Sequence, residues 1–296
     1  MKFHFAFLFV CFTALQARII LNPNYFEGDI ILSPEERRNI YKPNNKFGAS
    51  KKKWPSKTIV YEFAADIEKE IGAKQAIYAA INEYHRHTCL KFVRRTTQST
   101  YMEFYNGQGC GAPLGYRSGR SKISLQGPAC WKKGSVMHEI MHSLGFYHEQ
   151  SRPDRDNYVK ILWDNITPKD MKSNFQKQPY SNVDSMNSPY DYLSIMHYHK
   201  DGFAKRGTLT IETLDKRFQD KIGQRDGFSP SDIKQINKLY KCGKNFVTQP
   251  PLRTQVPVCK DKNPNCGFYL RFCKDPSWRD SMKKDCKFTC SFCDSS

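Results

Sequence analysis

Three histidines and a glutamate lie within residues 138–148, at spacings that suit a metal site. Four residues turn an α-helix by about 400°, so His138 and His142 project from one face within about 40° of each other. Two imidazoles placed in this way can bind one Zn²⁺ ion at about 2.0–2.1 Å. Glu139 lies about 100° round the helix from His138, which places it beside the metal as the base for a metal-bound water. Gly145 can adopt a positive φ and turn the chain back, so that His148 supplies a third nitrogen and one coordination position stays open.

The length of this pattern separates it from a chance match. With 8 His and 11 Glu among 296 residues, His-Glu-x-x-His arises by chance in roughly one such chain in a hundred. Adding Gly145 and His148 lowers this to roughly one in a hundred thousand, which disfavours an ordinary amphipathic helix with solvated histidines. The extended pattern followed by a methionine turn is the signature of the metzincin zinc endopeptidases. Residues 194–198, Ser-Ile-Met-His-Tyr, are a candidate for that turn.

The elements that must position these residues are short strands and a few helices. Apolar spacing predicts a helix over residues 68–87, and a second helix is expected over residues 135–144, ending at Gly145. Ser229 and Pro230 provide a cap and a first turn for a helix that runs to about residue 240. Strands with Gly-rich turns between them are expected at residues 58–63, 89–94, 101–105 and 122–125. This mixture predicts the α+β fold class.

Composition and the N-terminus indicate a secreted globular protein. Hydrophobic residues make up 39% of the chain and charged residues 26%, which excludes a mainly disordered or collagen-like chain. The apolar run at residues 3–15 is too short to span a bilayer, so we interpret residues 1–17 as a signal peptide and expect no transmembrane segment. The formal net charge of +18 favours acidic partners, such as matrix glycans or acidic substrate segments. No specific nucleic-acid partner is expected.

The cysteines divide the chain into parts. Cys11 falls in the signal peptide, which leaves ten cysteines, and an even number behind a signal peptide indicates disulfides in an oxidising compartment. Six of them lie within the last 38 residues, where so small a core needs covalent bridges. Cys290 and Cys293 could alternatively form half of a zinc site, although no histidine accompanies them. The predicted parts are a pro-segment (18–38, ending at the basic pair Arg37-Arg38), a catalytic domain (39–243), a Pro-containing linker (244–258) and a cysteine-rich domain (259–293).

Beyond the zinc motif, the chain resembles the astacin family of zinc metalloendopeptidases. The resemblance covers roughly residues 39–243 and rests on residues 148–156 (HEQSRPDRD), 194–198 (SIMHY), 222–225 (IGQR) and 237–242 (NKLYKC). It implies a two-lobed metzincin fold with a zinc cleft, in which the three histidines bind one catalytic zinc ion per chain. It also implies that Tyr198 is a displaceable further ligand, that Met196 lies beneath the metal, and that Glu149 orders the N-terminus created by activation.

Two shorter stretches carry resemblances of their own. Residues 26–29, Phe-Glu-Gly-Asp, resemble the family's aspartate switch, in which Asp29 would replace the catalytic water in a zymogen. The tail resembles a ShKT domain of the kind appended to nematode astacins, and such a scaffold does not by itself reveal a toxin-like activity. The resemblances imply the disulfide pairs Cys89–Cys242, Cys110–Cys130, Cys259–Cys293, Cys266–Cys286 and Cys273–Cys290.

The sequence departs from the family pattern at two places. Leu193 stands where astacins usually have glycine before the methionine turn, which puts the local backbone and the position of Tyr198 in question. Residues 110–113, Cys-Gly-Ala-Pro, are an unusual version of the first disulfide loop and could reshape the rim of the cleft. Asn165 begins the sole glycosylation sequon, and Pro168 follows it closely.

The function expected from these observations is hydrolysis of internal peptide bonds in extracellular proteins. The protein would be a secreted zymogen that needs an activating protease, with Glu139 and Tyr198 as catalytic residues. Two alternatives stay open: a secreted binding protein built on an inactive protease domain, and a channel-blocking toxin released from the tail. The complete set of ligands and base disfavours the first alternative, and the absence of a dibasic site in residues 244–258 disfavours the second.

Overall fold

The computed structural model describes residues 21–39, 53–179 and 185–243, and in the C-terminal part residues 262–263, 266, 272–273, 275–287 and 290. The predicted signal peptide and linker lie outside these residues, as do Cys259 and Cys293. Among the helices described, none is long and apolar enough to cross a membrane.

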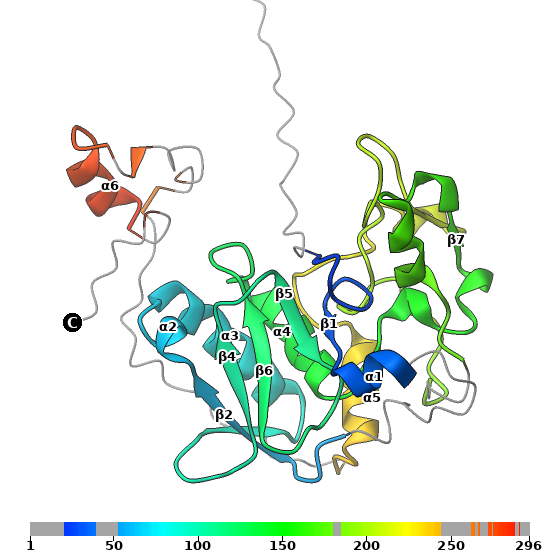
Figure 1. The fold of residues 1–296 in the computed structure, drawn as a ribbon, viewed down its shortest axis with the longest axis horizontal. Coiled ribbons are helices and arrows are strands. Elements are labelled where there is room, and N and C mark those ends of the chain that lie inside the picture. The colour runs from blue at the N-terminus through cyan, green and yellow to red at the C-terminus, as the bar shows by residue number, and fades with distance from the viewer. Residues whose placement is uncertain are drawn as a thin grey trace, which may run out of the picture.

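A six-stranded mixed sheet forms one half of the main body (Figure 1). Its strand order is β1-β5-β6-β4-β2-β3, and all neighbours are parallel except β5 and β6. The strands are β1 (Ile30–Ile31), β2 (Thr58–Phe63), β3 (Lys91–Arg94), β4 (Tyr101–Tyr105), β5 (Cys110–Pro113) and β6 (Arg120–Leu125). Residues 110–113 begin the expected first disulfide loop, which Cys110 closes by bonding to Cys130, and these four residues themselves form strand β5. They are buried and paired on both sides, because β1 from the predicted pro-segment adds to their free edge.

Two helices pack together against this sheet and complete the first core. The predicted helix at 68–87 is observed as a short α2 (Ala65–Glu68) followed by α3 (Ile71–His87), whose buried stripe follows the expected spacing. The central helix α4 (Lys133–Ser143) begins two residues earlier than predicted. The Tyr84 hydroxyl of α3 donates to the Met137 carbonyl of α4 at 2.7 Å, which fixes the register between the two helices.

The second half has little regular secondary structure. Its two-stranded antiparallel sheet pairs β7 (Val159–Ile161) with β8 (Ile211–Thr213), and short 3-10 turns connect the rest. A separate buried cluster includes Phe175, Tyr190 and Tyr198. Helix α5 (Pro230–Leu239) begins at the Ser229 cap, as predicted. Its buried residues pack into the first core. Two cores in two halves confirm the predicted α+β, two-lobed fold, and Figure 1 shows β1 and the short helix α1 (Pro34–Asn39) between the halves.

Four disulfides are present among the described residues, and they are pairs that the resemblance implies. Cys89–Cys242 closes 153 residues of sequence with a Cα–Cα distance of 5.4 Å, and Cys110–Cys130 joins the end of the sheet to the approach to α4. The C-terminal domain, which contains α6 (Arg279–Asp285), has bridges Cys266–Cys286 and Cys273–Cys290. The implied Cys259–Cys293 bridge lies outside the described residues.

Candidate active site

Helix α4 and the turn after it bring the three histidines together. His138 and His142 are fully buried on one face of α4, and Gly145 ends the helix with a φ of 111° that an L-residue rarely adopts. The chain therefore reverses and returns His148 to the same point, where its Nε2 lies 3.2 Å from Nε2 of His142. The turn at Gly145 therefore adds His148 to the two histidines of the helix.

A carboxylate from the N-terminal segment completes the cluster. Asp29 Oδ2 lies 3.2 Å from His138 Nε2 and 3.1 Å from His148 Nε2, while Oδ1 lies 3.4 Å from His142 Nε2. One ligand atom from each of these four buried residues lies within 4.8 Å of every other. Strand β1 begins directly after Asp29, and the pairing of its Ile30 with Ala112 of β5 holds this segment against the sheet.

The outer nitrogen of each imidazole has a fixed hydrogen-bond acceptor. His138 Nδ1 lies 2.7 Å from the Ile195 carbonyl, and His142 Nδ1 lies 2.7 Å from the Phe146 carbonyl. His148 Nδ1 lies 2.7 Å from Glu27 Oε2. Since carbonyl and carboxylate oxygens only accept, these contacts assign the proton of each neutral ring to Nδ1.

The remaining lone pairs all face one point. Three unprotonated Nε2 atoms and a buried carboxylate at 3.1–3.4 Å would repel one another without a cation between them. Three imidazoles and one carboxylate are a ligand set that Zn²⁺ takes up in tetrahedral geometry. The residues present therefore fit a zinc ion held by His138, His142, His148 and Asp29.

Glu139 lies beside this cluster without belonging to it. It is fully buried, and neither of its carboxylate oxygens has a hydrogen-bond partner in the part of the chain that the structure describes. Burial, and then the nearby charge of Asp29, raise the pKa of Glu139 well above its usual value, whereas the charge of Arg225 acts in the opposite direction. A buried carboxyl with free oxygens next to a metal site is suited to accept and release a proton.

The candidate methionine turn, residues 194–198, contacts His138 through the Ile195 carbonyl and is held by a residue far along the chain. Met196 is buried, and its carbonyl accepts a hydrogen bond from the Glu149 amide at 3.1 Å. Asp232, in the first turn of α5, accepts from the Ser194 hydroxyl at 2.7 Å and from the Ile195 amide at 2.9 Å. Burial raises the pKa of Asp232 to about 6. The cap of α5 thus also anchors the turn.

Comparison with known proteins identifies the family. A family model described as Astacin, a peptidase family, matches residues 46–241, and a ShK domain-like model matches residues 258–293. The chain belongs to the astacin family. As a member, it is a zinc metalloendopeptidase, and its predicted family and enzyme class are confirmed.

Curated relatives include nematode and mammalian proteases. "Zinc metalloproteinase nas-6" of Caenorhabditis elegans is 36% identical over 294 residues, which cover 92% of this chain and 84% of that protein. "Zinc metalloproteinase dpy-31" of Teladorsagia circumcincta is 36% identical over 277 residues, and the match covers 86% of this chain but 45% of that longer protein. Human "Meprin A subunit beta" is 38% identical over 227 residues, covering 76% of this chain and 31% of that protein.

A solved structure agrees with these matches. "High choriolytic enzyme 1", a hatching enzyme zinc-protease from the medaka fish Oryzias latipes, superposes with a TM-score of 0.59 at 34% identity. The superposition covers 73% of this chain and all of that one. The catalytic domain of this protease therefore shares the fold of the hatching enzyme.

Leu193 does not disturb the methionine turn of this astacin-family protease. Its side chain is 37% exposed, and its φ is not among the positive values of the described chain. Its amide donates to Asp191 Oδ1 at 2.9 Å, and its carbonyl accepts from Gln224 Nε2 at 2.7 Å. Because the side chain points outward, a leucine replaces the expected glycine without backbone strain.

Tyr198 lies next to the cluster, but its hydroxyl is engaged elsewhere. Its ring centroid is 4.6 Å from that of His148, and its backbone amide donates to Gln150 Oε1 at 3.0 Å. The hydroxyl donates to the backbone carbonyl of Glu27. In this state the N-terminal segment, and not the metal site, holds the Tyr198 hydroxyl.

Two other predicted residues have partners of their own. Glu149 is buried, accepts from Arg152 Nη1 at 3.1 Å and from the Asp191 amide at 2.8 Å, and burial raises its pKa to about 8. Asn165 is partly buried, and its Nδ2 donates to the Leu209 carbonyl at 2.8 Å. This contact ties the Asn165 side chain to the backbone carbonyl of Leu209.

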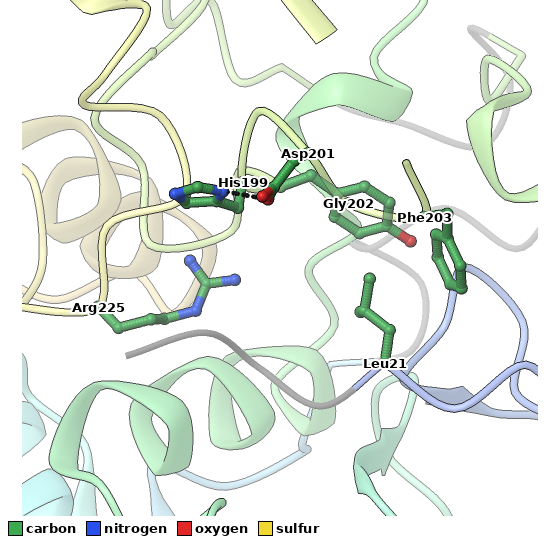
Figure 2. Close-up of a pocket in the computed structure, with 8 residues that line it drawn as sticks. Leu21, His199, Asp201, Gly202, Phe203 and Arg225 are labelled. Carbon is green, nitrogen blue, oxygen red and sulfur yellow. Dashed lines mark hydrogen bonds and ion pairs between the residues drawn. The ribbon is translucent and has the colours of Figure 1, made fainter. Parts of the chain in front are cut away.

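A cavity of about 280 Å³ opens beside Tyr198. Its wall combines the segment after the methionine turn with residues from both ends of the described main body: Leu21, Tyr198, His199, Asp201, Gly202, Phe203, Gly223 and Arg225. Figure 2 shows Arg225 and the paired His199 and Asp201 on one side of it, and Leu21 and Phe203 on the other. Arg225 Nη1 donates to the His197 carbonyl at 3.2 Å, while its buried Nε has no hydrogen-bond partner among the described residues.

Sequence reasoning missed several residues that shape this site. Glu27 was noted only as a neighbour of Asp29, and Arg225 only as part of a family motif. Asp232 was not singled out within the helix that Ser229 caps, and Gln150 appeared only within the stretch after His148. Only Asp232 had a usable signal, since an acidic residue three positions after the Ser229 cap marks a capping box.

Proposed function

We propose that this chain is a secreted endopeptidase made as a zymogen, with residues 18–38 as its pro-segment. The observation that carries the proposal is the Asp29 carboxylate, which lies 3.1–3.4 Å from Nε2 of all three histidines. A fourth protein ligand closes a zinc site, whereas catalysis needs an open position. Removal of the pro-segment would open that position for water and substrate.

The proposed mechanism assigns one role to each group of the site. His138, His142 and His148 hold one zinc ion, which when bound polarises the scissile carbonyl and lowers the pKa of the attacking water. Glu139 takes the proton of that water and later delivers it to the nitrogen of the leaving amine. The Tyr198 hydroxyl, released from the Glu27 carbonyl, donates to the developing oxyanion of the substrate.

Pro-segment contacts away from the metal support inhibition. Strand β1 covers the edge of β5, and Glu36 pairs with Arg117, whose Nη2 also donates to the Ile31 carbonyl at 2.6 Å. Arg37 and Arg38 follow in α1 with exposed side chains. An activating protease that prefers basic residues could cut there, and Glu149 would then bind the new N-terminus.

The cavity beside Tyr198 is suited to a substrate side chain next to the scissile bond. The Arg225 guanidinium has a buried Nε without a partner and no carboxylate pairs with it among the described residues, so an acidic side chain of the substrate would supply one. The net charge of +18 favours acidic proteins or matrix components more generally. Four disulfides support an extracellular location.

A peptide-cleavage assay tests this function. The secreted chain is purified with and without residues 18–38, and hydrolysis of fluorogenic peptides is followed with and without a zinc chelator. Cleavage that requires pro-segment removal and disappears with chelator is the expected result. A processed chain that contains zinc and cleaves none of the peptides would contradict the proposal and favour a binding role.

A further inference from the structure

Glu27 has a conformation that needs an explanation. It is fully buried and its φ is 46°, while Gly28 after it has a φ of 75°. A positive φ is disfavoured for a glutamate because its Cβ crowds the backbone, and a buried carboxylate needs hydrogen-bond donors. Both features are costly, so contacts made by this residue must hold it in place.

Those contacts lead directly to the metal site. Oε2 accepts from His148 Nδ1 at 2.7 Å, and Oε1 accepts from Gln178 Nε2 at 2.7 Å. The backbone carbonyl of Glu27 accepts from the Tyr198 hydroxyl. One residue of the pro-segment therefore binds both a histidine ligand and the tyrosine beside it.

The three histidines differ in what orients them. The acceptors for His138 and His142 are the carbonyls of Ile195 and Phe146, which belong to the catalytic domain and stay after activation. The acceptor for His148 is a carboxylate that leaves with residues 18–38. A carboxylate behind a ligating imidazole fixes the ring and raises the basicity of its metal-facing nitrogen more than a neutral carbonyl does.

We propose that Glu27 is a positioning residue of the zymogen, which orients His148 and strengthens its hold on zinc independently of the ligand supplied by Asp29. The inference rests on the proposed zinc site and pro-segment. Gly28 stands between Glu27 and Asp29, and a side chain there would clash, since its Cβ would lie 2.8 Å from the Phe203 ring. A glycine at this position therefore lets the chain pass close to Phe203 while the carboxylates of Glu27 and Asp29 both reach the histidines. Removal of the pro-segment then takes away both the Asp29 ligand and the Glu27 carboxylate that orients His148. The zinc affinity should therefore differ between zymogen and processed enzyme by more than the loss of Asp29 alone would cause.

The test measures zinc affinity and not only activity. The full pro-form is prepared as wild type, Glu27→Gln and Glu36→Gln, and the dissociation constant for zinc is measured by competition with a chromophoric chelator. Glutamine keeps the size and one acceptor oxygen of Glu27 but not the charge. Glu36 is the matched control, because it anchors the same segment through Arg117 and the Ser33 amide. The visible spectrum of each cobalt-substituted pro-form reports on ligand geometry.

We expect Glu27→Gln to weaken zinc binding about 10- to 100-fold and to alter the cobalt spectrum, while Glu36→Gln changes affinity less than about threefold. Equal affinity in wild type and Glu27→Gln, or equal weakening by both variants, would overturn the inference. A wild-type pro-form that binds no zinc would instead refute the proposed function.

A second comparison does not depend on the folding of Glu27→Gln. The Asp29→Ala pro-form lacks the fourth ligand but retains Glu27, so it should still hold zinc about 10- to 100-fold more tightly than the processed wild-type enzyme. Equal affinities in these two forms would show that His148 finds an equivalent partner after activation, and the inference would fail.

Discussion

The Glu139→Gln substitution should remove the catalytic base of this protease and leave its fold and zinc ligands intact. The two side chains have nearly the same shape, and neither Glu139 oxygen is hydrogen-bonded within the described residues, so the substitution breaks no native hydrogen bond. It removes a carboxyl whose pKa is raised by burial and by Asp29. The three histidine ligands and the carbonyls that orient two of them are untouched.

The expected loss follows from the role of a general base. A positioned base contributes about 10²- to 10⁴-fold to the rate, which corresponds to about 3–5.5 kcal/mol of activation free energy. We therefore expect kcat to fall by about that factor in the processed enzyme, with KM and zinc content close to wild type. The measurements are steady-state hydrolysis of a fluorogenic peptide, zinc per chain by atomic absorption, and the midpoint of thermal unfolding.

Ser143→Ala provides the matched control for this variant. Ser143 is buried in the same helix next to His142, and its hydroxyl has no hydrogen-bond partner in the described part of the chain. This change should leave kcat within about threefold of wild type. If Glu139→Gln with a full zinc complement kept more than about a tenth of wild-type kcat, the assignment of Glu139 as the base would be wrong.

Three further predictions concern what holds the site in place. Gly134→Ala should destabilise the fold by at least about 1–3 kcal/mol in chemical denaturation, because the new Cβ would lie 1.8 Å from the Arg225 carbonyl oxygen and one backbone must move. Burial raises the pKa of Asp232 in the folded protein from its ordinary value of 3.8 to about 6, so its stabilising contribution is complete below about pH 4 and is lost as the pH rises through 6. The free energy of unfolding should therefore fall across that interval by about 3 kcal/mol more in wild type than in Asp232→Asn; an identical pH dependence in the two proteins would contradict this. Replacing Cys89 and Cys242 together by alanine opens a loop that spans 153 residues and should lower stability by about 5 kcal/mol in the loop-entropy model, measured as the shift in urea midpoint, whereas an unchanged midpoint would show that the bridge adds little.

Local features of this protein were readable from its sequence. The helical spacing of His138 and His142, the turn at Gly145 and the capped start of α5 all appear in the structure. Each of these depends on backbone geometry within a few residues, which residue type and period express directly. The strand conformation of residues 110–113 was not readable in this way, because it depends on a partner about 80 residues away in β1.

The resemblance at residues 26–29 implied that Asp29 completes the site, but only the tertiary structure shows how the site is held together. Asp29 meets His138 across 109 residues, Glu27 meets His148 across 121, and Asp232 meets Ile195 across 37. Sequence carries no periodic signal for such contacts, since they depend on the path of the whole chain and on which buried polar groups must find partners. The histidine motif therefore determined what chemistry this protein can do, while folding determined which residues close, orient and support the site.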